Sequence, residues 1–197
     1  MARFNSFNYK KEVEYWFNNV EDHGEDVFSY GPKYYVGLIL KKIMPFLEIP
    51  NDEKICMLGT HNCYSFGILE EFYGKDRSIG FDLRNSTNRE NIIEGSIIDF
   101  DRNLIPSLSF CWNDLGNYSR NPYEKMYAQI AFANKVVKGG VFIGRDSSNR
   151  ARFPVDVLMQ ELNFDNMTLL EFFRKNNLSN EDLDESILDS HLISFRK

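Results

Sequence analysis

The sequence predicts an α/β fold built on a mainly parallel sheet, and three observations support this prediction. Short apolar runs of strand length alternate with amphipathic, helix-length segments through most of the 197 residues. One segment, from Lys54 to Asp82, reads as a complete strand–turn–helix–strand unit. No repeat or low-complexity linker divides the chain. We therefore expect a single domain over residues 1–197, with an N-terminal helical flank at 1–50 and a core at 51–197.

Two helices are expected ahead of the core. Tyr9–Val20 carries apolar residues at helical spacing and would lie against the sheet as a lid or flank. A second helix starts at Pro32, a residue suited to a first helical turn, and runs to about Leu47. Pro45 is expected to kink or shorten its last turn because proline cannot donate a backbone hydrogen bond.

The Lys54–Asp82 unit has a layout that suits a nucleoside-containing ligand. Its pieces are a strand at Ile55–Leu58, a turn at Gly59–Asn62, a helix at Cys63–Tyr73 closed by Gly74, and a strand at Ser78–Phe81. Gly59 permits a tight turn that brings backbone N–H groups and a helix N-terminus close to a ligand. Asp82, at the tip of the second strand, could accept hydrogen bonds from ribose hydroxyls. An ordinary βαβ unit without a ligand would show the same pattern.

Further elements follow in alternation. Strands are expected at Asn91–Ile93, Ile97–Phe100, Leu108–Trp112, Val141–Ile143 and Leu192–Phe195. Helices are expected at Tyr123–Val137, capped by Lys138–Gly140, and at Pro154–Leu162 and Met167–Asn176. The acidic segment Ser179–Asp189 is expected to be turn-like.

Composition excludes several classes of function. The net charge of −6 argues against nucleic-acid binding through a broad basic surface. No apolar run reaches membrane-spanning length, and the N-terminus lacks the apolar segment of a secretion signal. The three cysteines are unevenly spaced and form no zinc-binding pattern, which predicts reduced thiols and a cytoplasmic setting.

In the order of these pieces, the chain resembles the class I S-adenosylmethionine (SAM)-dependent methyltransferases over roughly Pro32 to Asp146. The resemblance is carried by Ile55–Gly59 at the cofactor loop, Asp82 at the ribose-binding acid, Glu94–Ser96 beside the adenine, Cys111–Asp114 at the tip of the fourth strand, and Lys138–Val141 at the turn into the fifth. It implies a three-layer Rossmann-like fold that binds SAM. The cofactor contacts that it implies are Gly59, Thr60, His61, Asp82, Ser96, Ile97 and Asn113.

The cofactor loop departs from the family pattern. Leu58 stands where the family usually has an acid, the loop keeps one glycine, and Ser96 replaces a common Asp. A non-catalytic, methyltransferase-like partner protein is therefore an alternative. A nicotinamide-binding Rossmann enzyme is a third reading, but it requires Gly-x-Gly-x-x-Gly, and Gly59 and Gly67 do not have that spacing.

If the chain is an enzyme, the resemblance implies methyl transfer to a small molecule, and we expect an oxygen of a sugar or related metabolite as the acceptor. The polar, aromatic segment 117–123 and the acidic net charge favour such a substrate. Candidates for the catalytic base are Asp114, His61 and Asp146; His61 is considered because imidazole titrates near neutral pH. Some O-methyltransferases bind a divalent cation after strands four and five. That resemblance makes Asp114, Asp146 and Asn149 candidate Mg²⁺ ligands, and a polar surface loop is the alternative.

Overall fold

A computed structural model describes residues 32–60, 64–82, 85, 87–95, 101–113, 129–145 and 155–197. Within these residues the chain forms a seven-stranded sheet in the order β3-β2-β1-β4-β5-β7-β6. The strands are β1 (Lys54–Leu58), β2 (Ser78–Asp82), β3 (Ile92–Glu94), β4 (Leu108–Asn113), β5 (Val136–Arg145), β6 (Phe164–Thr168) and β7 (His191–Arg196). The sheet is mainly parallel, as the sequence predicts: β1 to β5 pair in parallel, and β7 runs antiparallel to both of its neighbours.

The helices include α2 (Pro32–Ile43) with a 3₁₀ turn at Met44–Phe46, α3 (Tyr64–Tyr73), α5 (Val155–Glu161), α6 (Leu169–Lys175) and α7 (Glu185–Asp189). A short 3₁₀ turn lies at Arg102–Leu104, and residues 129–133 are helical. The change to 3₁₀ geometry at Met44 confirms that Pro45 shortens the second predicted helix. Gly74 ends α3 with a φ of +86°, as its position predicts.

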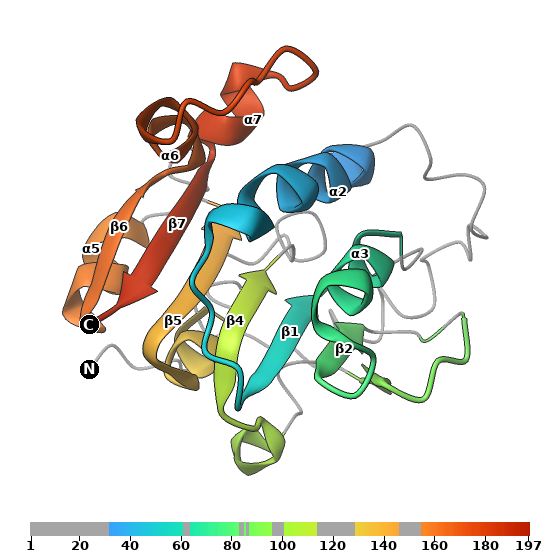
Figure 1. Ribbon diagram of the computed structural model, residues 1–197. Coiled ribbons are helices and arrows are strands. Elements are labelled where there is room, and N and C mark those ends of the chain that lie inside the picture. The colour runs from blue at the N-terminus through green and yellow to red at the C-terminus, as the bar shows by residue number, and fades with distance from the viewer. Residues whose placement is uncertain are drawn as a thin grey trace, which may run out of the picture.

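Helices cover both faces of the sheet (Figure 1), so the fold has three layers. Along β1, Ile55 and Met57 join the core cluster formed with α2, α3, α6 and α7, whereas Cys56 and Leu58 join the cluster on the opposite face. The opposite cluster includes Phe132 of the 129–133 helix and Met159 of α5. This alternation follows from the two-residue period of side chains along a strand.

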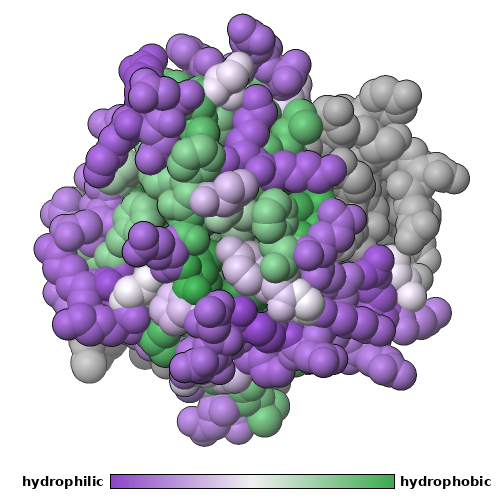
Figure 2. All heavy atoms as spheres, in the orientation of Figure 1, coloured by the Kyte–Doolittle hydropathy of each residue, from purple (hydrophilic) through white to green (hydrophobic). Residues whose placement is uncertain are grey.

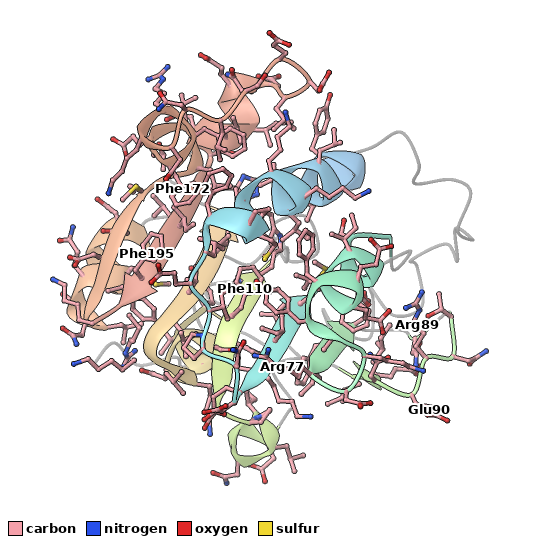
Figure 3. The ribbon with its side chains drawn as sticks, viewed as in Figure 1. Arg77, Arg89, Glu90, Phe110, Phe172 and Phe195 are labelled. Atoms are coloured by element: carbon pink, nitrogen blue, oxygen red, sulfur yellow. The ribbon has the colours of Figure 1, made fainter. Side chains whose placement is uncertain are left out.

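The face that carries α2 and α3 has hydrophobic side chains toward its middle and hydrophilic ones around its rim (Figure 2). Phe172 of α6 stacks on Phe195 of β7, with 6.2 Å between the ring centroids, and holds the C-terminal helices against the sheet (Figure 3). In the described part of the chain, no helix has both the length and the apolar character needed to cross a membrane.

One boundary prediction is wrong. The helix expected at Tyr123–Val137 ends earlier, because β5 already begins at Val136. Lys138–Gly140 does not cap a helix but lies inside β5. There the register against β4 shifts between Leu108 and Phe110, and Gly139 has a φ of +78°. Glycine is favoured both at the end of a helix and at an irregularity inside a strand. Gly139 and Gly140 were therefore assigned to a helix cap although they belong to β5.

The sequence did not predict β6. The helix expected over Met167–Asn176 is confirmed to within two residues as α6, which starts at Leu169, but residues 164–168 ahead of it form an edge strand. Asp165 and Asn166 are rare in strands, so the segment lacks a strand pattern and is formed by pairing with β7. Thr168 is the helix N-cap, with a reciprocal capping box to Glu171.

Apart from β5, which begins at Val136 and not at Val141, the other predicted strands and helices within the described residues hold to within a residue or two, although α7 forms inside the segment expected to be turn-like. The expected elements at Tyr9–Val20 and Ile97–Phe100 lie outside the described residues, as do residues 123–128 of the helix expected at Tyr123–Val137.

Candidate cofactor site at the carboxyl edge of the sheet

The strand order reverses at the carboxyl ends of β1 and β4, which is where open α/β sheets form their ligand-binding crevice. From β1 the chain proceeds through α3 to β2 on one side, and it later returns to β4 on the other side. Open α/β sheets bind ligands at such a switch in strand order, outside the carboxyl ends of the strands. Leu58 and Asn113, the last residues of β1 and β4, are paired at this point.

Gly59 makes the turn out of β1 with a φ of +75°, a conformation that disfavours any residue with a side chain. Its N–H donates to the backbone carbonyl of Phe81 at 2.8 Å and so extends the pairing with β2 by one residue. The N–H of Gly59 is therefore used within the sheet. Any loop amide that faces a ligand has to come from the residues after it.

Asp82 ends β2, and its side chain is partly exposed at the carboxyl edge. The hydroxyl of Thr60 donates to Oδ2 of Asp82 at 3.2 Å, so the loop after β1 and the tip of β2 are directly joined. Two of the sequence-predicted cofactor residues thus contact each other. A partly exposed carboxylate at this position can accept hydrogen bonds from the hydroxyls of a ribose.

The tips of β2 and β3 are also tied together. Asp82 and Glu94 are paired, and the N–H of Gly95 donates to the backbone carbonyl of Asp82 at 2.9 Å. The exposed Glu94 carboxylate accepts the N–H of Asn85 at 3.0 Å. Below this edge, Glu70 of α3 accepts from Arg89 and Asn91, which fixes the connection between β2 and β3 on the helix. The strand tips beside the crevice are therefore held by several independent contacts.

Asn113, the last residue of β4, is the fourth of the predicted cofactor contacts that the structure describes. It is 4% exposed, and in register it lies between Leu58 of β1 and Gly144 of β5. A larger residue at Gly144 would be crowded, because a Cβ there would stand 2.9 Å from the Phe142 ring and 3.4 Å from the Gln129 amide nitrogen.

The remaining predicted site residues lie outside the described residues. They are His61, Ser96, Ile97, Asp114, Asp146 and Asn149, so the candidate catalytic base and the candidate Mg²⁺ ligands stay predictions. Among the residues that the structure does describe, no three His, Cys, Asp or Glu side chains lie close enough together to hold a metal ion.

Sequence reasoning missed His191, which begins β7 opposite Arg145 and therefore also lies at the carboxyl edge. It is 5% exposed, and its ring centroid lies 5.7 Å from that of Trp112 in β4. Nδ1 lies 2.7 Å from the backbone carbonyl of Ile187, an acceptor only, so Nδ1 carries a proton. The predicted strand began one residue later, and only knowledge that this strand runs antiparallel could have placed His191 at this edge.

The strand order of the sheet also differs from that of a typical dinucleotide-binding Rossmann domain. Dinucleotide-binding Rossmann domains typically run in the order 3-2-1-4-5-6. Here the antiparallel β7 is inserted between β5 and β6.

The chain is similar in fold to solved structures with which it shares little sequence identity. A sugar N-methyltransferase, KedS8 from Streptoalloteichus sp. ATCC 53650, matches with a TM-score of 0.52 and 9% identity over 100% of this chain and 96% of that chain. A SAM-dependent methyltransferase from Archaeoglobus fulgidus matches with a TM-score of 0.53 and 11% identity, over 83% of this chain and 93% of that chain. The chain has the class I methyltransferase fold.

The N-methyltransferase NodS from Bradyrhizobium japonicum WM9, in complex with S-adenosylhomocysteine (SAH), shares this methyltransferase fold at a TM-score of 0.50. It is 9% identical and is matched over 95% of this chain and 96% of that chain. No family model matches the sequence, and no curated protein matches it. At these identities the similarity establishes the methyltransferase fold, and the activity has to be argued from the site.

Proposed function

We propose that the chain is a SAM-dependent methyltransferase that acts on a small molecule. The observation that carries the proposal is the partly exposed carboxylate of Asp82 at the tip of β2, joined to the loop after β1 beside a switch in strand order. The solved methyltransferases support the proposal through their common fold, and one of them was determined with SAH bound.

Bound SAM would supply an electrophilic methyl group, and the chain's own residues would position it and exclude water. Asp82 would accept the hydrogen bonds of the ribose hydroxyls. Gly59 would let the backbone of the loop approach the ligand closely, because it has no side chain to obstruct the turn. Removal of the acceptor's proton would fall to Asp114, His61 or Asp146, the sequence-predicted candidates.

We propose a sugar or a related metabolite as the acceptor, methylated on oxygen. The net charge of −6 and the polar segment 117–123 favour a small hydroxylated substrate over a nucleic acid. KedS8 is a sugar N-methyltransferase, which makes an amino sugar the natural comparison in a substrate screen. A screen of matched hydroxyl and amino sugars with methyl-labelled SAM would separate the two acceptor atoms.

Isothermal titration calorimetry (ITC) with SAM, SAH, NAD and NADP tests the cofactor class. We expect SAM and SAH to bind, NAD and NADP not to bind, and Asp82→Ala to weaken SAH binding at least tenfold because charge-assisted hydrogen bonds are lost. Asp165→Ala is the matched control, since it removes an exposed carboxylate that pairs with Lys197 at 2.7 Å on β6, at the far edge of the sheet. SAH binding that survives Asp82→Ala unchanged would overturn the site assignment.

Failure of all four ligands to bind the folded protein would overturn the enzymatic proposal. It would favour the alternative in which the one-glycine loop reflects a non-catalytic partner protein. A fold-matched chain from Haloferax volcanii, with a TM-score of 0.51 and 12% identity, was solved in a complex between a methyltransferase activator and a putative methyltransferase. Co-purification would then be the next measurement.

A further inference from the structure

Thr60 is buried at the cofactor edge, although its partner is a partly exposed carboxylate. The side chain of Thr60 is 3% exposed, and its Oγ1 donates to Oδ2 of Asp82 at 3.2 Å. The hydroxyl therefore reaches the carboxylate from the protein side. A carboxylate held in this way has fewer orientations available before a ligand arrives.

Gly80 provides the space that Thr60 occupies. A Cβ built on Gly80 would stand 2.6 Å from Cγ2 of Thr60 and 2.8 Å from Cγ1 of Ile92, both shorter than real contacts allow. Gly80 lies two residues before Asp82 on β2, so both point to the same side of the sheet. The methyl group of Thr60 thus rests over Gly80 while its hydroxyl meets Asp82. The three residues form one unit, which we call the Thr60 latch.

We propose that Thr60 is a positioning residue for cofactor recognition, which holds the Asp82 carboxylate in the orientation that binds a ribose diol. This inference rests on the proposed function and deepens it. Gly80 is part of the same device, because any larger residue would displace the methyl group of Thr60.

The test is ITC of SAH with three variants. Thr60→Val keeps the shape of the side chain and loses the hydroxyl, so we expect three- to tenfold weaker binding. Thr60→Ser keeps the hydroxyl and should bind within about twofold of the natural protein. Gly80→Ala should weaken binding at least as much as Thr60→Val, because the displaced Thr60 loses its contact with Asp82.

A double-mutant cycle separates positioning from general structural damage. If Thr60 acts through the carboxylate, Thr60→Val should change SAH affinity less than about twofold when Asp82 is already alanine. The same substitution should also have little effect on binding of 2′-deoxy-SAH, which lacks one of the two hydroxyls. Equal losses in both backgrounds and with both ligands would show a structural role only and would overturn the inference.

SAH binding by the natural protein distinguishes a failure of the proposed function from a failure of the Thr60 latch. If the natural protein does not bind SAH, the proposed function fails and the Thr60 latch fails with it. If the natural protein binds SAH and Thr60→Val binds equally well, only the latch is wrong. Urea midpoints for each variant confirm that the protein compared is folded.

Discussion

Cys56 is a buried core thiol whose pKa differs between the folded and the unfolded chain. Its thiol is fully buried, and burial, together with the facing thiol of Cys111 on β4, raises its pKa well above the ordinary value. The folded state therefore keeps the proton after the unfolded chain has released it. Both thiols belong to the core on one face of the sheet, and neither forms a disulfide.

This shift predicts how folding stability depends on pH. Because the pKa of Cys56 is higher in the folded state, its contribution is complete below about pH 8.5, the ordinary thiol value, and is lost as pH rises toward the raised pKa. We expect the free energy of unfolding to fall by up to about 1.4 kcal/mol per pH unit in this window. Urea titrations of the natural protein and Cys56→Ala at pH 7 to 10 measure it. A variant with an unchanged slope would contradict the assignment.

At the residue scale, the sequence could predict positions that are set by the backbone or by a strand end. Gly59 was placed at a turn and Asp82 at a strand tip, because both are local features; their binding roles stay predictions. The Thr60–Asp82 contact was not predictable, because it joins residues 22 positions apart in an orientation that depends on Gly80. His191 was missed for the same reason: its position depends on the direction of β7.

At the scale of elements, we expect glycine-to-alanine substitutions at two positions to change the free energy of unfolding in opposite directions. A Cβ on Gly140 in β5 would stand 2.8 Å from Val136 Cγ1 and 2.9 Å from the backbone oxygens of Ser109 and Val137. Gly140→Ala should therefore destabilise the fold by about 1–3 kcal/mol. Gly67 lies inside α3 with nothing within 4 Å, so Gly67→Ala should stabilise by about 0.5–1 kcal/mol. Urea denaturation of both variants decides this, and equal signs would refute it.

Arg77 organises the opposite, amino edge of the sheet (Figure 3). Its guanidinium donates to the carbonyls of Pro50 at 2.7 Å and Glu53 at 3.0 and 3.1 Å, and to Ser109 Oγ at 3.3 Å. It also lies over the Tyr73 ring, with Cζ 5.6 Å from the centroid. One planar group thus joins the end of α3, the entry to β1 and the start of β4.

Arg77→Lys should destabilise the protein by about 1–3 kcal/mol, because an ammonium group cannot donate in this forked geometry. The matched control is Arg174→Lys. Arg174 is exposed and pairs with Glu185 at 3.7 Å, and we expect a change within about 0.5 kcal/mol. Urea midpoints measure both. Since Arg77 lies at the edge away from the crevice, SAH affinity of the folded variant should not change, and a selective loss of affinity would contradict this division.

The elements that the sequence predicted best are those that carry their own pattern. β1, α3 and β2 have apolar runs and a glycine stop, and each was placed within a residue. β6 has no such pattern and forms because β7 offers it backbone partners. The start of β5 was misassigned because Val136 and Val137 continue an apolar, helix-like segment up to the glycines.

At the scale of the whole molecule, alternation of strands and helices was enough to predict an α/β fold with a mainly parallel sheet, and the family resemblance implied three layers, but neither gave the order of the strands. Each strand of β1 and β4 is apolar on both faces, which requires helices on both sides. The order arises from contacts between distant strands, such as β5 with β7, and no local pattern encodes them. The position of the crevice between β1 and β4 therefore became visible only in the folded chain.

In this proposal the carboxyl edge of the sheet binds the ligand and the amino edge does not, and hydrogen exchange can test this difference. Amide exchange at short labelling times reports local opening of the structure. Binding of SAH should slow this exchange at the carboxyl edge, around residues 58–60, 80–82 and 111–113. Segments 50–54 and 104–108 at the amino edge should exchange at the same rate with and without SAH, because no ligand contact reaches them. Mass spectrometry of peptides from the natural protein and Asp82→Ala provides the comparison. Protection that appears at the amino edge alone would place the ligand elsewhere and overturn the assignment of the crevice.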